Sequence, residues 1–266
     1  MSKKKTPTRV WVVSADKHAP LHDRMALSCF KQAVEIIKPD GIIDLGDFCE
    51  GASVSNWQWK KKKRPPIEYQ VVRVEAELVR ANALMDELDD SYDRAGVKRK
   101  VFCQGNHDAW FDMFVEENPV LKDKYLFKNA LRLAERGYEF YERGRYFRIP
   151  TSGPICYHGE HHKGMYHAKN HSLKSGANDI IYGHWHDVQV YSHGSPAGVA
   201  TAYCVGCLKD LGPKANDWLN YQPTNWKHAF AVVSMLPGRT HTVDIIEIVN
   251  GRCAVWGQMI QANRRK

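Results

Sequence analysis

Side chains that bind metals stand directly after several apolar runs of this chain. The run from Arg9 to Ala15 stops at Asp16, and the segment GIIDL stops just before Gly46 and Asp47. A buried strand that ends in a polar group places that group at the edge of a sheet, where open α/β sheets bind their ligands. The pattern occurs at five places, and its residues are Asp16, His18, Asp47, Asn106, His107, Asp108, His158, His184 and His186. Together they predict a site for two metal ions.

The ligand types indicate which ions the site takes. The set contains imidazoles, carboxylates and one amide oxygen, without any thiolate. Such donors suit a borderline or hard divalent ion rather than a closed thiolate site. We therefore expect two divalent ions, Mn first, with Fe, Zn or Ni as alternatives. Glycines beside these residues, such as Gly105 and Gly183, suit a backbone that turns sharply close to an ion.

The five segments also resemble a known family. DKH at 16–18, GD at 46–47, GNHD at 105–108, HG at 158–159 and GHWH at 183–186 are similar to the five ordered blocks of the calcineurin-like metallophosphoesterases. The blocks span about two thirds of the chain. The resemblance implies an α/β fold in which a two-sheet β-sandwich is flanked by α-helices.

The same resemblance implies a role for each residue. The implied ligands are, for one ion, Asp16, His18 and His186; for the other, Asn106, His158 and His184; and for both, as a bridge, Asp47. His107 would be the catalytic histidine, with Asp108 as a partner that orients it. A hydroxide shared by the two ions would attack phosphorus, so that no covalent phosphoenzyme is needed.

Hydrophobic periodicity predicts the elements that position these groups. Helices are expected at 23–38, 67–92 and 119–136, and one face of the second carries an apolar seam. After His186 the segments 188–193, 199–207, 228–236, 241–249 and 253–260 have the composition of short strands separated by turns. We expect a single domain over residues 1–266, with a second sheet that is largely antiparallel.

Charge and aromatic residues bear on the substrate. The formal net charge is +8 and the pI is about 9.0, which favours polyanionic partners. The segment 48–66 places two tryptophans before five consecutive cations, and it starts at the bridging ligand. Its aromatic rings could stack on bases and its lysines could neutralise phosphates. The predicted substrate contacts are Trp57, Trp59, Lys60, Lys61 and His161.

A second interpretation of these aromatic residues stays open. Trp57 and Trp59 could cover the core, with the lysine run simply solvated. Trp218 and Trp226 could line the same opening, although packing is the stronger interpretation of that pair.

Three functions fit the pattern. The first is a phosphodiesterase or nuclease acting on DNA or RNA, the second a phosphomonoesterase for a small ester, a nucleotide or a phosphoprotein, and the third a metal-binding scaffold without activity. Protein phosphatases of the family usually contain GDxxDRG, whereas Phe48 to Gly51 follow Asp47 here, without the arginine. The segment looks more like the small phosphoesterases of phages and bacteria.

Cysteine content and hydropathy indicate the compartment. The seven cysteines have no framework spacing, and Cys204 and Cys207 are expected to be a reduced pair on a strand. The apolar stretches fall far short of the roughly 20 residues of a membrane helix. The basic residues 1–8 lack the apolar segment of a signal peptide and are expected to be flexible, and residues 262–266 are expected to form a basic C-terminal tail. We expect a cytoplasmic protein, in the host cytoplasm if it is phage-encoded. The sequence leaves the oligomeric state open.

Overall fold

The larger sheet has a parallel centre built from the first half of the chain. The computed structural model describes residues 9–56, 63–238 and 240–263. The strand order in this sheet is β11-β10-β1-β2-β3-β4. Four strands run parallel, and they are β1 (Arg9–Ser14), β2 (Gly41–Asp44), β3 (Arg99–Cys103) and β4 (Tyr138–Tyr141). Two late strands, β10 (Ala229–Leu236) and β11 (Thr240–Glu247), add to the β1 side in antiparallel orientation.

The second sheet is mixed, so the expectation of a largely antiparallel sheet is wrong. Its order is β5-β6-β7-β9-β8, and β7 pairs in parallel with both β6 and β9. The strands are β5 (Phe147–Arg148), β6 (Ile155–Tyr157), β7 (Ile180–Tyr182), β8 (Val188–Ser195) and β9 (Gly198–Val205). The prediction failed because β10 and β11, which are antiparallel, extend the first sheet instead of the second.

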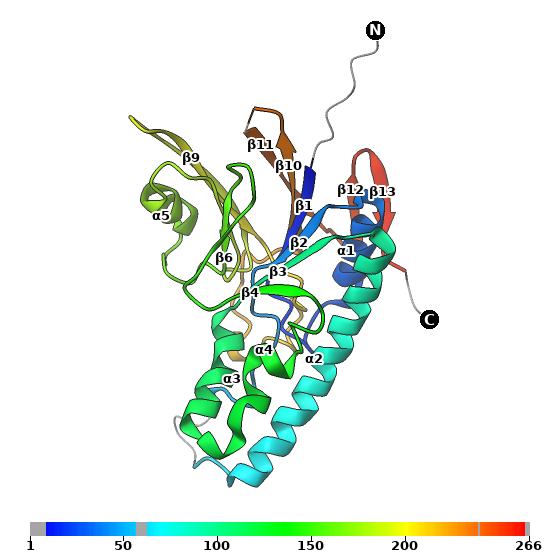
Figure 1. Ribbon diagram of the computed structural model, residues 1–266, viewed down its shortest axis with the longest axis vertical. Coiled ribbons are helices and arrows are strands. Elements are labelled where there is room, and N and C mark those ends of the chain that lie inside the picture. Colours follow the sequence, from blue (N-terminus) through cyan, green and yellow to red (C-terminus); the bar gives the residue numbers. More distant parts are fainter. Residues whose placement is uncertain (1–8, 57–62, 239, 264–266) are drawn as a thin grey trace.

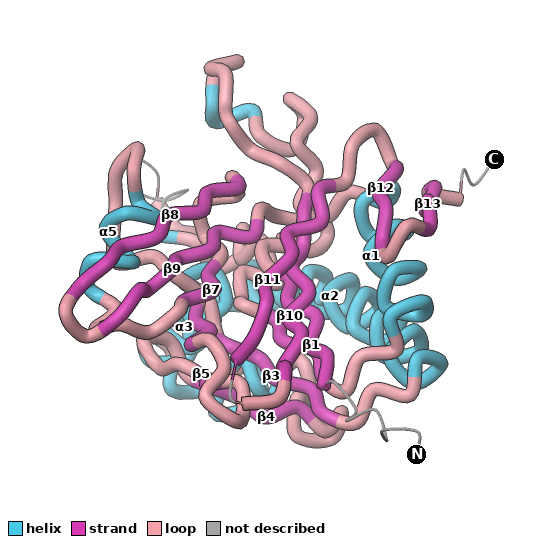
Figure 2. The backbone as a smooth tube through the Cα atoms, turned by 90° about the horizontal axis from the view of Figure 1, so that it is seen from above, coloured by secondary structure: helices cyan, strands magenta, loops and turns pink. Residues whose placement is uncertain are grey.

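The segment 253–260 is a hairpin rather than one strand. It forms β12 (Arg252–Val255) and β13 (Gln258–Gln261), which pair in antiparallel orientation. Trp256 and Gly257 have positive φ angles of 50° and 78°, so the chain turns between the two strands. Figure 2 shows this hairpin beside α1 (Arg24–Ile37).

Side-chain alternation along β1 divides the core into layers. Trp11 and Val13 belong to the cluster between the two sheets, whereas Val12 belongs to the cluster between the first sheet and the helices. Successive side chains of a strand point to opposite faces, which explains the division. On the far side of the second sheet, α5 (His167–Lys174) contributes Ala168 to a third cluster. Figure 1 shows α5 on the side away from α1 and α2 (Ile67–Ala95). The predicted two-sheet sandwich with flanking helices is confirmed.

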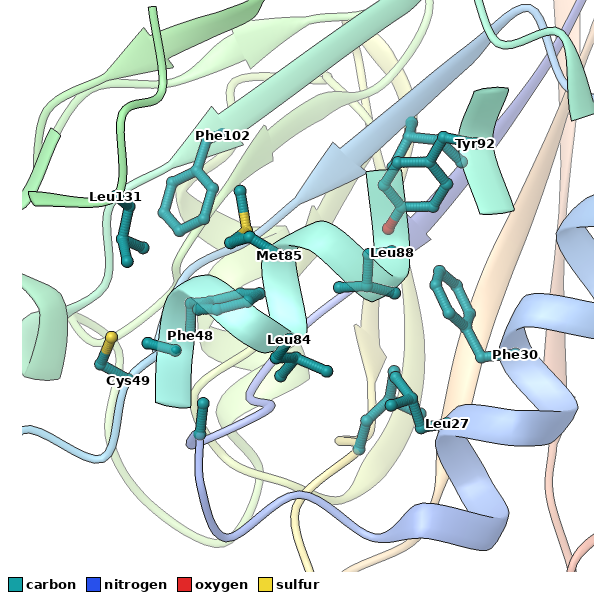
Figure 3. Packing of buried hydrophobic residues seen from close by; sticks show 14 of the residues in the cluster. Leu27, Phe30, Phe48, Cys49, Leu84, Met85, Leu88, Tyr92, Phe102 and Leu131 are labelled. Atoms are coloured by element: carbon teal, nitrogen blue, oxygen red, sulfur yellow. The ribbon is translucent and has the colours of Figure 1, made fainter. Parts of the chain in front are cut away.

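The first two helices follow the predicted periodicity. The Asp23 carboxylate accepts a hydrogen bond of 2.7 Å from the backbone N–H of Ala26 and so caps α1. The long helix α2 buries a seam against the first sheet, and Figure 3 shows Leu84, Met85 and Leu88 packed near Phe102 and Phe48. This seam is the apolar stripe that the sequence predicted.

The third predicted helix is wrong in position. The structure forms α3 (Asn106–Glu117), then a 3-10 helix η2 (Pro119–Tyr125) and the single turn α4 (Phe127–Ala130). Leu126 has an extended backbone with ψ 132°, which interrupts any continuous helix over 119–136. The apolar residues of that segment do pack in the core, but α3 is the helix that carries a motif to the site.

Candidate metal centre

The predicted ligands come together at the carboxyl ends of the strands. Asp16 and His18 follow β1, Asp47 follows β2, and His184 and His186 follow β7. Ligand atoms of Asp16, His18 and His186 lie within 4.8 Å of one another. Those of Asp47, His158 and His184 form a second group with the same spacing. The two groups match the two predicted ligand sets, with Asn106 beside the second.

Asp47 lies between the two groups. Its Oδ2 is 3.3 Å from His158 Nε2 and 4.0 Å from each of His18 Nε2 and His184 Nδ1. The Asn106 side-chain oxygen lies 3.0 Å from His158 Nε2. One carboxylate therefore faces histidines of both groups, which is the position that a bridging ligand requires.

The hydrogen bonds on the outer side of the rings fix which nitrogens face the centre. His18 Nδ1 lies 2.8 Å from the Glu50 carboxylate, and His158 Nδ1 lies 2.8 Å from the backbone carbonyl of Leu45. Nδ1 is therefore the donor in the neutral form of each ring, and the lone pair is on Nε2. His18 Nε2 is 3.1 Å from His186 Nε2, and His158 Nε2 is 3.1 Å from His184 Nδ1. Two imidazole nitrogens at this distance need a proton or a cation between them.

Buried atoms without partners support a cation. Asp16 Oδ1 is buried and has no hydrogen-bond partner among the described residues. A buried carboxylate oxygen left in this way is costly unless an ion satisfies it. The donor set and its geometry therefore fit divalent metal ions.

Electrostatics in the centre keep most of its imidazoles neutral. Burial lowers the pKa of His18 and of His184 to about 4. Burial also opposes charge on His158, but Asp47 and Asp16 raise its pKa to about 10. Burial favours the neutral form of Asp47, yet His158 and His107 hold its pKa well below its usual range. The carboxylates thus draw positive charge into this pocket.

The backbone of the ligands is strained. Left-handed φ angles occur at Asp16 (53°), His18 (50°), Asp47 (48°), His184 (74°) and His186 (62°). This region disfavours residues with a Cβ by about 1–2 kcal/mol each. Such strain is typical of functional sites, where the surrounding structure must hold it.

Two glycines allow the ligand loops to approach each other. A Cβ on Gly105 would lie 2.2 Å from Asp47 Oδ1, and a Cβ on Gly183 would lie 2.6 Å from Asp16 Oδ2. Any side chain at either position would displace a predicted ligand. The glycines of the GNHD and GHWH motifs are therefore needed for close packing.

His107 lies beside the centre, at the start of α3. Its Nδ1 is 2.6 Å from the backbone carbonyl of Glu50, and its backbone N–H donates to Asp47 Oδ1 at 2.8 Å. The ring packs against Trp110 with 4.0 Å between centroids and a tilt of 36°, and it meets the His18 ring edge-on at 4.7 Å. With Nδ1 as the donor, Nε2 is the nitrogen that can exchange a proton with a substrate.

Asp108 does not contact the His107 ring, and the prediction that it orients this ring needs correction. Its two oxygens accept backbone hydrogen bonds from Phe48 (3.0 Å), Cys49 (3.1 Å) and Gly105 (3.0 Å). Burial and the charge of Asp47 raise the pKa of Asp108 to about 8. Its role is to hold the loop after Asp47 against the start of α3.

Glu50 is the main residue that sequence reasoning missed. Its carboxylate contacts His18 and accepts a hydrogen bond of 3.1 Å from the ammonium of Lys209, while its backbone carbonyl accepts from His107. A carboxylate on the outer nitrogen of a ligand histidine fixes the ring and raises its basicity. The only signal for Glu50 was its place in the segment that departs from GDxxDRG.

A buried lysine also supports the first ligand loop. Lys17 is fully buried, and its ammonium donates to Asp44 Oδ2 at 2.6 Å and to Ser14 Oγ at 2.9 Å. The pair ties the loop after β1 to the end of β2. It thereby fixes the relative positions of Asp16 and Asp47.

The predicted substrate contacts are only partly described. Trp57, Trp59, Lys60 and Lys61 lie outside the described residues, as do residues 1–8 and 264–266. The side chain of His161 is 57% exposed and lines a cavity of about 250 Å³ that also reaches His158. His161 is thus close to the centre without belonging to it.

Trp226 lies against the centre. Its ring meets that of His186 at 4.5 Å between centroids, and the Trp218 ring follows at 6.1 Å. Trp218 is 61% exposed, so the interpretation of this residue as core packing is wrong.

Comparisons with known proteins agree with the fold. The chain is 25% identical to the "Gene 54 protein" of Mycobacterium phage D29, over 93% of this chain and 97% of that protein. It is equally similar to the "Gene 54 protein" of Mycobacterium phage L5, at 25% identity with the same shares covered. No protein-family model matches the chain. Within the described residues, no helix has the length and apolar character needed to cross a membrane.

Solved structures share the arrangement of elements. Vacuolar protein sorting 29 from Cryptosporidium parvum aligns with a TM-score of 0.52 at 11% identity, over 96% of this chain and 98% of that chain. A double mutant of the same protein from Entamoeba histolytica aligns with a TM-score of 0.50 at 11% identity, over 96% and 99%. The ordered motifs, the two-sheet layers and this likeness identify the fold of the chain as that of the calcineurin-like metallophosphoesterases.

Proposed function

We propose that this chain is a dinuclear metal-dependent phosphodiesterase that cleaves DNA or RNA. The observation that carries the proposal is the central position of Asp47, whose Oδ2 faces His158 at 3.3 Å and His18 at 4.0 Å. A single carboxylate shared by two histidine groups is typical of two-metal hydrolases.

The residues in place assign the ligands. We propose that Asp16, His18 and His186 hold one ion, that Asn106, His158 and His184 hold the other, and that Asp47 bridges them. Mn suits this set of nitrogen and oxygen donors, and Fe, Zn or Ni are the alternatives. When bound, two such ions supply a nucleophile from water near neutral pH and offset charge on the phosphoryl oxygens.

We propose that His107 donates a proton to the leaving oxygen. Glu50 accepts from Nδ1 and Trp110 supports one ring face, so the ring orientation is fixed and Nε2 is available. A positioned general acid contributes about 10²- to 10⁴-fold. Glu50 acts twice, because its side chain orients His18 while its backbone orients His107.

Three features favour a nucleic acid as the substrate. The net charge is +8, the basic run 60–64 begins 13 residues after Asp47, and tryptophans lie at the centre itself. The position where protein phosphatases of the family carry arginine is Gly51, and a Cβ there would lie 2.9 Å from the Trp110 ring. That position has no space for an arginine that grips a terminal phosphate.

Arg143 favours a second candidate, a phosphomonoesterase. Its guanidinium pairs with Glu160 through bonds of 2.6 and 2.7 Å, and it is close enough to Asp47 for that charge to help raise its pKa. A terminal phosphate carries more charge than a diester and could compete with Glu160 for this group.

Free cysteines support a reducing compartment. All seven cysteines are unpaired and buried. We therefore propose that the protein is located in the cytoplasm, and in the host cytoplasm if it is a phage product like the relatives from phages D29 and L5. We also propose that residues 1–266 act as one domain.

The deciding experiment compares ester types across metals. Turnover of bis-p-nitrophenyl phosphate, p-nitrophenyl phosphate and a labelled oligonucleotide is measured with Mn, Ni, Zn and Fe, using native protein and Asp47→Asn. Cleavage of the diester and the oligonucleotide that the variant abolishes supports the proposal. Preference for the mono-ester supports the second candidate. If no ester is turned over and the purified protein holds fewer than two ions per chain, the chain is a metal-binding scaffold without activity.

A further inference from the structure

Three tryptophans border the candidate metal centre, and each touches one of its histidines. Trp110 packs against His107 at a tilt of 36°, Trp185 meets His184 edge-on at 5.0 Å between centroids, and Trp226 meets His186 at 4.5 Å. All three rings are half-buried. The surroundings of each ring decide whether it is free to bind part of a substrate.

Trp110 and Trp185 are held by the fold. Trp185 also stacks on His167 at 4.9 Å and donates its indole N–H to the carbonyl of Gly159 at 3.3 Å. Trp110 lies between the His107 ring and Gly51. These two rings therefore brace the centre.

Trp226 is different because its second aromatic neighbour belongs to an open surface. Its ring lies 6.1 Å from that of Trp218 at an interplanar angle of 46°. Trp218 is 61% exposed and Tyr221, in the same loop, is 91% exposed. Neither indole N–H of the pair has a hydrogen-bond partner within residues 9–56, 63–238 and 240–263. The pair thus forms an open wedge of aromatic surface next to a predicted ligand.

The segment that presents this wedge, residues 209–227, is tied to the centre at both ends. Just before it, the backbone N–H of Leu208 donates to the carbonyl of Asp16 at 3.1 Å. At its other end the N–H of Lys227 donates to the carbonyl of His186 at 2.8 Å. The position of the 209–227 loop relative to the centre is therefore fixed by two ligand residues.

The tip of the 209–227 loop is ordered from within. Asn216 is 3% exposed, and its side-chain amide donates to the carbonyls of Asp210 at 2.8 Å and Gly212 at 2.9 Å. Trp218 follows in the short helix η3 (Asp217–Leu219). A rigid aromatic ring beside a reaction centre binds a planar group with little loss of entropy.

We propose that Trp218 and Trp226 form a stacking subsite for one nucleobase of the substrate, next to the phosphate held at the centre. The inference rests on the proposed phosphodiesterase function and names the part of the substrate that gives it affinity. Stacking tolerates any base, because every base presents a π-face. The subsite therefore favours single-stranded or frayed nucleic acid without selecting a sequence.

The test compares two diesters that share a leaving group but differ in having a base. They are thymidine 5′-(p-nitrophenyl phosphate) and methyl p-nitrophenyl phosphate, which has no second aromatic ring. Loss of one stacked base corresponds to roughly 5- to 150-fold, so Trp218→Ala should raise KM for the thymidine ester by that factor. The variant should leave turnover of the base-free ester unchanged, and Trp218→Phe should retain most of the affinity. Trp256, 59% exposed in the β12–β13 turn, supplies the matched control Trp256→Ala.

Binding separates this inference from the catalytic proposal. Fluorescence anisotropy is measured with a labelled octathymidylate and with an abasic oligomer of equal length. If Trp218→Ala binds the octathymidylate more weakly than the native protein does but binds the abasic oligomer equally well, the subsite is supported even if no diester is cleaved. Equal effects of Trp218→Ala on both esters and both oligomers, or no effect on any, would overturn it.

Discussion

Two buried clusters with nearly the same residue types lie side by side, and only one has the character of a metal centre. The central cluster consists of the seven predicted ligands. The neighbouring cluster consists of His167, Asp187 and Cys204, whose ligand atoms also lie within 4.8 Å of one another. Asp187 directly follows His186 in the chain, so the two clusters share a strand end.

The clusters differ in what satisfies their polar atoms. In the neighbouring cluster, Asp187 Oδ2 accepts from the side chains of Gln189 at 2.7 Å and Asn225 at 2.8 Å. His167 bridges the Asp187 carboxylate and the Tyr182 hydroxyl, at 3.0 and 2.7 Å. In the central cluster, by contrast, ring nitrogens face each other at 3.1 Å in two pairs. One carboxylate oxygen of each cluster, Asp16 Oδ1 and Asp187 Oδ1, lacks a hydrogen-bond partner among the described residues. Asp187 Oδ1 lies 3.0 Å from His167 Nε2, whereas Asp16 Oδ1 is 3.6 Å from His186 Nε2. The comparison teaches that ring nitrogens facing one another indicate a metal site better than residue types do.

Removing the bridge should have the largest effect. Asp47→Asn should lower kcat by more than the roughly 10²- to 10⁴-fold expected for a lost general acid, because both ions lose a ligand. Metal analysis should also find fewer than two ions per chain. Asp187→Asn is the matched control from the neighbouring cluster. If that variant loses as much metal, the distinction between the clusters fails.

Loss of the proton donor should come next. His107→Ala should lower kcat by about 10²- to 10⁴-fold while metal content stays as in the native protein. Steady-state kinetics together with metal analysis separates the two effects. A variant that also loses metal would show that His107 is a ligand rather than the acid.

A smaller effect is expected from the carboxylate behind His18. Glu50→Gln should weaken Mn binding by about 10- to 100-fold, because the ring loses the partner that raises its basicity. Titration calorimetry on the metal-free protein measures this change. Glu247→Gln, which removes a surface pair with Lys227 at 2.8 Å, should leave the affinity unchanged. Equal affinities for both variants would contradict the role of Glu50.

Low pH should reduce the free energy of unfolding through His171, which lies near the neighbouring cluster. His171 stacks on Tyr182 at 3.9 Å between centroids, and burial and nearby histidines lower its pKa to about 3. The unfolded chain therefore takes up a proton that the folded chain refuses, and stability is lost progressively as the pH falls from 6.5 towards 3. Urea unfolding of His171→Gln should show a weaker dependence over this range. An unchanged slope would exclude His171 as the source.

The smallest effect on metal and turnover is expected at Cys204. Cys204→Ser should leave metal content and kcat unchanged, since His167 and Asp187 of the neighbouring cluster already pair with each other and with nearby side chains. A hydroxyl at this fully buried position should lower the free energy of unfolding by about 1–3 kcal/mol. Denaturant unfolding and metal analysis measure the two quantities. Loss of an ion would place a metal in this cluster.

The ligand positions could be predicted from sequence because each is a local signal. A polar residue after an apolar run marks a strand end, and parallel strands bring such ends to one edge. Supporting contacts give no such signal. Glu50 lies 32 residues from His18 and 159 from Lys209, so its role depends on tertiary packing. The sheet that β10 and β11 join also depends on non-local contacts, because the sequence pattern of an antiparallel strand fits either sheet.

The left-handed backbone at Asp16, His18, Asp47, His184 and His186 has an evolutionary consequence. Glycine adopts this conformation without a steric penalty, so replacing any one of these residues by glycine would relax the loop that holds it. A laboratory selection for heat resistance of the metal-free protein would therefore favour glycine at these positions, and the selected variants would have lost donors of the centre.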